Sequence, residues 1–187
     1  PQLGATGVAA HLVTNASGFN VIYGPVRATD LPAFLDADCQ AVPEMRRVSF
    51  ALRDRIVVIP NELTFWAQWG LPVIVILALL GQAQLAGVLL GASLAGIVLV
   101  PVLLPWLPGK AFSVKGMTMG LLLGVPGVWA IAGTTGASSA AGLLLIAVSC
   151  TSFIALNFTG CSTFTSLTGT RSETLRAVPI QIVGFIV

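Results

Sequence analysis

The sequence predicts a small α/β head followed by an all-α domain of several membrane spans. Hydrophobic residues make up 56% of the 187 residues and charged residues only 9%, against about 25% in soluble domains. The charges are also segregated: residues 1–62 hold five Arg and six acidic residues, whereas residues 63–187 hold four basic residues and one acid. Alternating strand-like and helix-like patterns occur only in the first segment. We therefore divide the chain into a head, 1–62, and a membrane domain, 63–187.

The head is predicted to be the C-terminal part of a parallel α/β sheet. Residues 4–13 (GATGVAAHLV) start with glycines and continue in a helical pattern, and residues 19–26 (FNVIYGPV) form a β-branched and aromatic run before a turn. Residues 27–38 (RATDLPAFLDAD) predict a helix with Thr29 as its N-cap, and residues 55–60 (RIVVIP) predict a buried strand. Such alternation is typical of βαβ units. So short a segment cannot cover both faces of the sheet, so we expect further strands upstream.

Two long uncharged blocks predict four membrane-spanning helices. One crossing needs about 20 residues, and the blocks at 63–109 and 116–170 contain 47 and 55 residues. The predicted spans are at about 63–83, 85–107, 113–133 and 137–157. A further apolar run starts at Ala177 and reaches Val187 after 11 residues, too few to cross. We therefore expect a truncated fifth span in the C-terminal portion of a longer protein.

The positions of Lys and Arg predict the sidedness of these spans. Short loops rich in Lys and Arg remain in the cytoplasm. In this chain the basic residues near the spans lie before the first, after the second and after the fourth: Arg46, Arg47, Arg53, Arg55, Lys110, Lys115, Arg171 and Arg176. The turns on the other side carry no charge. The sequence thus predicts a multi-pass protein of the cytoplasmic membrane, in contact with membrane lipid, with its head on the cytoplasmic side.

Several classes of function receive no support from the sequence. The net charge of +2 comes without a basic stripe, which argues against nucleic acid as a partner. The three cysteines, Cys39, Cys150 and Cys161, form neither a CxxC motif nor a disulfide framework. No titratable residue lies in the middle of a predicted span, whereas ion-coupled transporters usually use one. A pump is therefore disfavoured.

Five stretches of the chain carry a family resemblance. They are PQLGATGVAAH (1–11), GFNVIYGPVRATDLPAFLDA (18–37), PEMRRVSFALRDRIVVIPNEL (43–63), LPWLPGKAFSVKG (104–116) and NFTGCSTFTSLTGT (157–170). Together they resemble the C-terminal two-thirds of the mercury-methylation corrinoid proteins, membrane-anchored relatives of the large subunit of the corrinoid iron–sulfur protein. The YGPVRA and NFTG-STFTSL segments are the most specific. The cap helix of that family contains a Trp-Cys pair whose Cys is the cobalt ligand, and it has no match in these residues.

The resemblance implies a fold, a cofactor and a reaction. The head would be the C-terminal part of an α/β Rossmann-like corrinoid-binding domain, and the multi-span domain would anchor it. A cobalamin-type corrinoid would carry a methyl group from a donor such as a methyl-folate to mercuric ion, with the protein supplying orientation. A ferredoxin-like iron–sulfur protein would re-reduce the cobalt. By this resemblance, no catalytic residue and no metal ligand lies in these 187 residues. The alternative is a non-catalytic membrane protein or transporter with a small cytoplasmic ligand-binding domain.

Two loops of the head are the predicted corrinoid contacts. Ligands of open α/β sheets bind beyond the carboxyl ends of the strands, where glycine allows close approach to the backbone. The resemblance together with this placement predicts contacts from Gly4, Ala5, Thr6, Gly7, Tyr23, Gly24, Pro25, Val26 and Arg27. Ordinary βα turns are the alternative, because a Gly-x-x-Gly pair alone is a weak signal.

The remaining metal-binding side chains are weaker candidates. His11, the only histidine, lies in a helical pattern and is predicted to be structural rather than an axial cobalt ligand. Cys39 is predicted to have no role. Cys150 and Cys161 carry thiols, which suit mercuric ion, but Cys161 lies beyond the apolar run, so a thiol relay is disfavoured.

Small residues and a polar loop complete the predictions for the membrane domain. Glycine recurs at every fourth position at Gly87 and Gly91 and at Gly116, Gly120 and Gly124, a spacing that lets membrane helices pack closely. The Ser- and Thr-rich residues 157–173 either dock against the head, line a path for substrate, or only connect and cap two helices.

Overall fold

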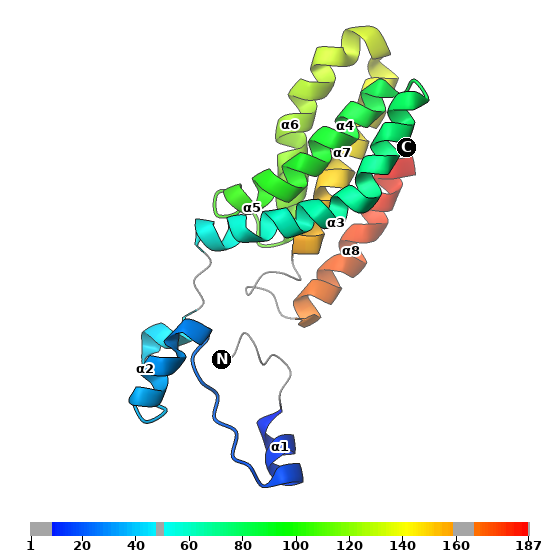
Figure 1. The fold of residues 1–187 in the computed structure, drawn as a ribbon. Helices are drawn as coiled ribbons and strands as arrows, with labels where there is room; N and C mark the ends of the chain where they lie inside the picture. The colour runs from blue at the N-terminus through cyan, green and yellow to red at the C-terminus, as the bar shows by residue number, and fades with distance from the viewer. Residues whose placement is uncertain (1–8, 48–50, 159–166, 187) are drawn as a thin grey trace. The chain divides into compact units, whose positions relative to one another are not determined.

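The computed structural model describes residues 9–47, 51–158 and 167–186. The chain divides into two compact units, Pro1–Phe50 and Ala51–Val187, and each is described by itself. Every regular element in the described ranges is a helix (Figure 1). The predicted α/β Rossmann-like fold of the head is therefore wrong for the part of the chain that the structure describes.

The first unit consists of short helices joined by extended segments. They are α1 (Ala10–Ser17), the 3₁₀ turn η1 (Ala28–Asp30), α2 (Leu31–Asp36) and the 3₁₀ turn η2 (Pro43–Arg46). A helix thus forms within the predicted 27–38, and its first turn contains the proline, but Thr29 lies in η1 and is not the N-cap of α2. Among the described residues of this unit, the side chains of Pro25, Val26 and Phe34 are buried.

The predicted strand at residues 19–26 is an extended segment without a ladder. Phe19, Ile22 and Tyr23 are exposed, and a backbone hydrogen bond from Val26 N–H to Met45 O at 2.9 Å joins the end of the segment to η2. A β-branched, aromatic run becomes a strand only where a second strand accepts and donates its backbone hydrogen bonds. The described part of this unit contains no such partner.

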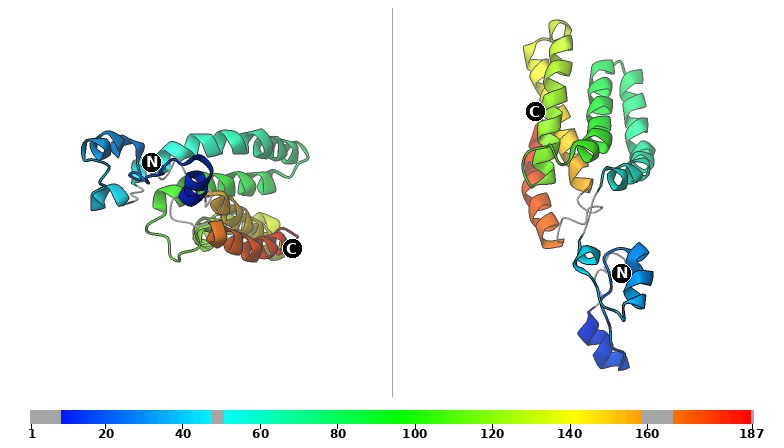
Figure 2. Two further views of the ribbon diagram at one scale, coloured as in Figure 1. Left: turned by 90° about the horizontal axis from the view of Figure 1, so that it is seen from below. Right: turned by 90° about the vertical axis from the view of Figure 1, so that its left-hand side faces the viewer.

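The second unit begins with a long helix that replaces the second predicted strand. Helix α3 (Leu52–Leu79) is 28 residues long and includes the RIVVIP segment. A short apolar run does not by its periodicity distinguish a strand from a helix, and within a membrane a helix satisfies its own backbone. Pro60 and Pro72 lie inside α3, which bends part-way along its length (Figure 2). Proline removes a backbone donor and is an established cause of such bends.

The next span changes helix type in its second half. It comprises α4 (Ala83–Leu94), a π-helical turn η3 (Ala95–Leu99) and α5 (Val100–Leu103). Pro101 explains the wider turn, because its ring would clash with the carbonyl four residues earlier in a regular α-helix and it has no N–H to donate. The span is therefore continuous but locally widened before Pro101.

Three further helices complete the bundle. They are α6 (Phe112–Thr135), α7 (Ala137–Asn157) and α8 (Leu167–Ile186). Within the described ranges, four helical segments are long and apolar enough to cross a membrane: Leu52–Leu79, Ala83–Leu103, Phe112–Thr135 and Ala137–Asn157. Their number agrees with the four complete spans that the sequence predicts, by length and composition. Helix α8 starts ten residues before the predicted Ala177, and so it includes the end of the predicted polar loop.

The glycines of α6 set its distance from α7. A Cβ placed on Gly116 would lie 2.6 Å from Ser152 Cα, and one on Gly120 would lie 2.8 Å from Val148 Cα. Only glycine permits this approach, as the spacing predicts. On α4, in contrast, a Cβ on Gly87 or Gly91 would meet nothing within 4 Å. The packing role predicted for these two glycines is therefore wrong, since they face open space.

Candidate functional site

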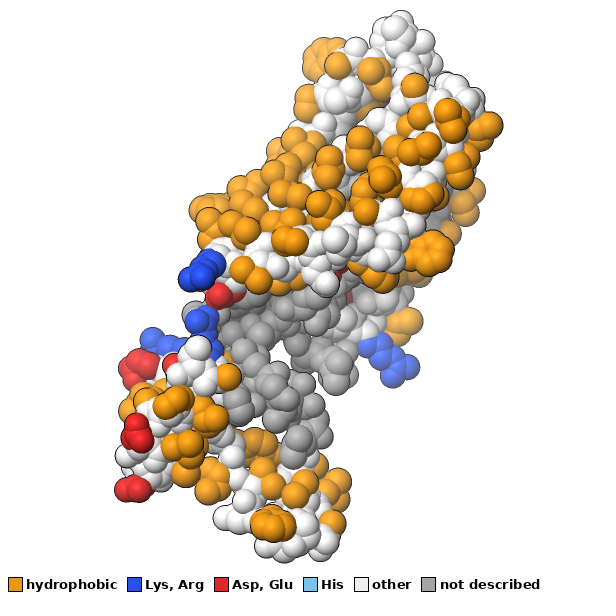
Figure 3. Space-filling model, in the orientation of Figure 1, with side chains coloured by type: hydrophobic (Ala, Val, Ile, Leu, Met, Phe, Trp, Pro, Cys, Tyr) orange, Lys and Arg blue, Asp and Glu red, His pale blue; other side chains and the backbone are white. Residues whose placement is uncertain are grey.

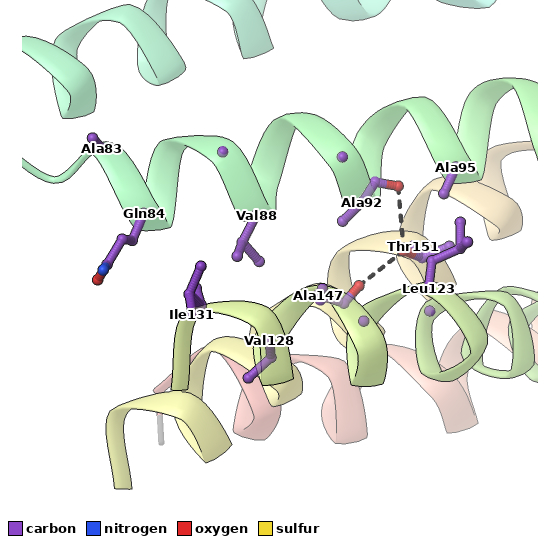
Figure 4. Close-up of a pocket in the computed structure, with 15 residues that line it drawn as sticks. Ala83, Gln84, Val88, Ala92, Ala95, Leu123, Val128, Ile131, Ala147 and Thr151 are labelled. Atoms are coloured by element: carbon purple, nitrogen blue, oxygen red, sulfur yellow. Dashed lines mark hydrogen bonds between the residues drawn. The ribbon is translucent and has the colours of Figure 1, made fainter. Parts of the chain in front are cut away.

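An apolar hollow of the bundle lies between α4, α6 and α7 (Figure 4). Its volume is about 530 Å³, within the range of small-molecule sites. Glycine and short aliphatic side chains dominate the lining: Ala83, Gly87, Val88, Gly91, Ala92, Ala95, Gly120, Leu123, Gly124, Gly127, Val128, Ile131 and Ala147, with Gln84 and Thr151. Val88 and Ile131 point toward one another across it (Figure 4). The open glycines of α4 create this hollow.

Both polar side chains of the hollow are engaged in hydrogen bonds. Gln84 Nε2 donates to Thr134 Oγ1 at 3.2 Å. Thr151, which is fully buried, donates its hydroxyl to the carbonyls of Ala147 at 2.9 Å and Ala92 at 3.2 Å (Figure 4). None of the described residues that line the hollow is titratable. Its chemistry therefore suits an apolar occupant and offers no acid, base or nucleophile for catalysis.

The buried cysteine of the bundle packs as a small hydrophobic residue. Cys150 on α7 lies among Ala92 and Ala147, and its Sγ is 3.7 Å from Ser93 Oγ on α4. Cys161 lies outside the described residues. No group of three His, Cys, Asp or Glu side chains that could hold a metal ion occurs in the described ranges. These contacts do not test the disfavoured thiol relay to mercuric ion, because it needs both cysteines.

Two cations bind carbonyl groups at the end of α5. The Arg55 side chain is only 6% exposed, and its Nη1 donates to Pro101 O at 3.0 Å and Val102 O at 2.8 Å. Lys115 Nζ donates to Leu104 O at 2.7 Å and to Leu107 O at 2.8 Å. The last carbonyls of a helix lack partners within the helix and carry partial negative charge, which favours cations there.

A polar network joins α6, α7 and α8 at the same end of the spans. Glu173 Oε1 of α8 accepts hydrogen bonds from Ser113 N–H at 2.7 Å and Ser113 Oγ at 2.8 Å, and so it caps the start of α6. Ser152 Oγ donates to Ser113 O at 3.0 Å, and Gln181 Nε2 donates to Ser152 Oγ at 2.8 Å. Gln181 is buried, and its Oε1 has no partner among the residues that the structure describes. These contacts orient α8 against the other two helices.

A second, polar hollow of about 480 Å³ lies beside the first half of α3. Its lining consists of Asn61, Glu62, Thr64, Phe65, Gln68 and Asn157. Glu62 lies within α3 because this helix starts at Leu52, well before the predicted span at 63–83. An ionisable residue that lies within a candidate span marks a candidate functional position, which the predicted boundary had placed in the head.

The structure places one of the two predicted corrinoid loops. Gly4, Ala5, Thr6 and Gly7 lie outside the described residues. In the second loop the Tyr23 hydroxyl accepts from Ala10 N–H at 3.1 Å, and a Cβ on Gly24 would lie 3.6 Å from the Phe34 ring. Pro25 and Val26 are buried, and Arg27 is half-buried. His11 is exposed and Cys39 half-buried.

The described residues of the first unit do not by themselves fit a corrinoid. They contain no strand whose carboxyl end could face a macrocycle. Pro25 and Val26 face inward, and the Val26 N–H is already bonded to Met45 O. No step of a cobalt reaction is therefore assigned to these residues.

Sequence reasoning missed the residues that bind between helices. Arg55 lies in an apolar run that predicted a strand, and Lys115 lies at the edge of a predicted span. Glu173 could have been singled out from the sequence, because it is the only acidic residue after Glu62. No protein-family model, curated protein or solved structure matches the chain.

Proposed function

We propose that this chain forms the membrane anchor of a corrinoid-dependent methyltransferase that methylates mercuric ion. The five stretches that resemble mercury-methylation corrinoid proteins support the reaction, and the helical bundle supports the anchoring role. One observation gives the main support for the anchoring role. Every Lys and Arg of residues 51–187 lies in the first half of α3, α6 or α8 or in the connection before α6, while hydrophobic side chains cover much of the face of the bundle that Figure 3 shows.

The proposal separates anchoring from chemistry. When bound, the corrinoid would supply the cobalt that carries the methyl group, and its ligands would lie outside the described residues. The basic end of the bundle would face the cytoplasm. The bundle would then hold the catalytic machinery close to the membrane without contributing a reacting group.

Purification of the protein from its native membrane tests the reaction. We expect an absorbance spectrum of bound corrinoid, and methylmercury formation when mercuric ion, a methyl donor and a reductant are supplied. A well-folded, membrane-derived protein with neither property would contradict the proposal and favour the non-catalytic alternative.

A replacement experiment tests the anchoring role separately. In cells that methylate mercury, residues 51–187 are deleted, or are exchanged for an unrelated bundle with the same number and direction of spans. Deletion should release the remaining protein from the membrane fraction, and the exchange should restore both membrane location and methylmercury formation. An exchanged protein at normal level in the membrane, yet without activity, would show that this bundle does more than anchor.

A further inference from the structure

A buried positive charge, that of Arg55 on α3, lies at the end of α5 without a carboxylate partner among the described residues. Arg55 is 6% exposed, and both of its hydrogen bonds go to carbonyl oxygens. Its Nε–H is buried and has no hydrogen-bond partner in the described part of the chain. The neighbouring Asp54 is engaged at the start of α3, where its carboxylate accepts the Ala51 N–H at 3.1 Å. A buried charge is costly unless it is paired, so this guanidinium lacks a full counter-charge.

A second cation binds the same segment, residues 101–110, and a third lies in it. Lys115 is bonded to the carbonyls of Leu104 and Leu107, a few residues beyond those that Arg55 binds. Lys110 is exposed in the connection between α5 and α6. We name Arg55, Lys110 and Lys115 the basic collar, because each of them lies in residues 101–110 or binds a carbonyl of that segment. A helix C-terminus offers only about half a negative charge, which does not balance three cations.

The surroundings of the basic collar are those of a membrane surface. Trp106, in the same connection, is 71% exposed, and tryptophan is enriched where bilayers meet water. Next to Arg55 on α3, Ile56 and Val57 are 46% and 69% exposed. The collar thus combines positive charge, an interfacial aromatic ring and exposed aliphatic side chains.

We propose that the basic collar binds the phosphate of an anionic phospholipid from the leaflet that this end of the bundle faces. The phosphate would supply the missing counter-charge, and the acyl chains would lie along the exposed aliphatic residues of α3. Charge complementarity favours an anionic lipid as the ligand, because the cytoplasmic leaflet is negatively charged and attracts Lys and Arg close to membrane spans. The inference is independent of any reaction that the protein takes part in.

Native mass spectrometry of the purified full chain in detergent tests the proposal. Phosphatidylglycerol and phosphatidylcholine with identical acyl chains are added at equal concentration, and the fraction of protein with each lipid is measured. We expect a preference for phosphatidylglycerol of about fivefold per engaged cation, and this preference should fall as salt is added. Equal binding of the two lipids would overturn the proposal without any variant.

Matched variants locate the site. The K110Q/K115Q double variant removes two charges, while the amide introduced on α6 can still donate to a carbonyl, and the R171Q/R176Q variant removes two exposed charges on α8 as a control. The first should lose most of the preference and the second should keep it; equal losses would overturn the assignment to the collar. Inorganic phosphate should not displace the lipid, and displacement would indicate a small-anion site instead.

Discussion

The contact of Gly116 with α7 tests the packing of the two most closely associated helices. A Cβ on Gly116 would lie 2.6 Å from Ser152 Cα and 2.7 Å from Thr151 O, and neither backbone atom can move aside without moving α7. Gly127 lies on the same helix, but a Cβ there would meet nothing within 4 Å. Gly116→Ala therefore forces the helices apart, whereas Gly127→Ala leaves their distance unchanged.

The difference between these two variants isolates the packing energy. Both replace a helical glycine by alanine, so the gain in helix propensity cancels. Overpacking then lowers the free energy of unfolding of Gly116→Ala by about 1–3 kcal/mol relative to Gly127→Ala, about 5- to 140-fold in the unfolding equilibrium. The assay is reversible unfolding in mixed micelles with increasing SDS, followed by far-UV circular dichroism. Equal stability of the two variants would refute the close approach of α6 and α7.

Three further predictions address sidedness, capping and the thiol. Single cysteines in the turn 81–84 or at Gly136 should react with a membrane-impermeant maleimide added to intact cells, and one at Lys110 should not, because basic loops stay inside; the reverse pattern would overturn the orientation. Glu173→Gln removes the charge but keeps an acceptor for Ser113 and should cost about 0.3–1 kcal/mol, whereas Glu173→Ala should cost about 1–3 kcal/mol in thermal or SDS unfolding; equal effects would argue against the cap. Cys150→Ala should leave methylmercury formation by cells within a few-fold of wild type, because a buried cysteine acts as a small hydrophobic residue; loss of activity at unchanged protein level would instead assign the thiol to substrate delivery.

The number and approximate positions of the long apolar helices could be predicted, because a bilayer crossing needs about 20 consecutive apolar residues. The predicted 113–133 and 137–157 lie within two residues of α6 and α7. Helix α3 was predicted to start at residue 63 but starts at Leu52. The part of α3 before residue 63 contains a proline and four charged residues, Arg53, Asp54, Arg55 and Glu62. Such residues are common in soluble segments, and composition alone does not show that they belong to the same helix as the apolar run.

The sites were harder to predict because they depend on partners distant in the chain. Arg55 binds carbonyls 46 and 47 positions away. The four-residue glycine spacing is the same on α4 and α6, yet it produces a tight contact on α6 and a hollow on α4. In the first unit, local patterns suggested a strand, but strand formation needs a pairing partner that no local pattern supplies.

The π-helical turn Ala95–Leu99 sets the rotational phase of everything after it in that span. One extra residue in a helix rotates the following residues by about 100° while lengthening it by only about 1.5 Å. Removing one residue from this turn would leave a span of nearly the same length, with Pro101 and Val102 turned away from Arg55. The span should therefore accept many substitutions on its lipid-facing side but no single-residue deletion before Pro101, although hydropathy alone would rank the deletion as harmless.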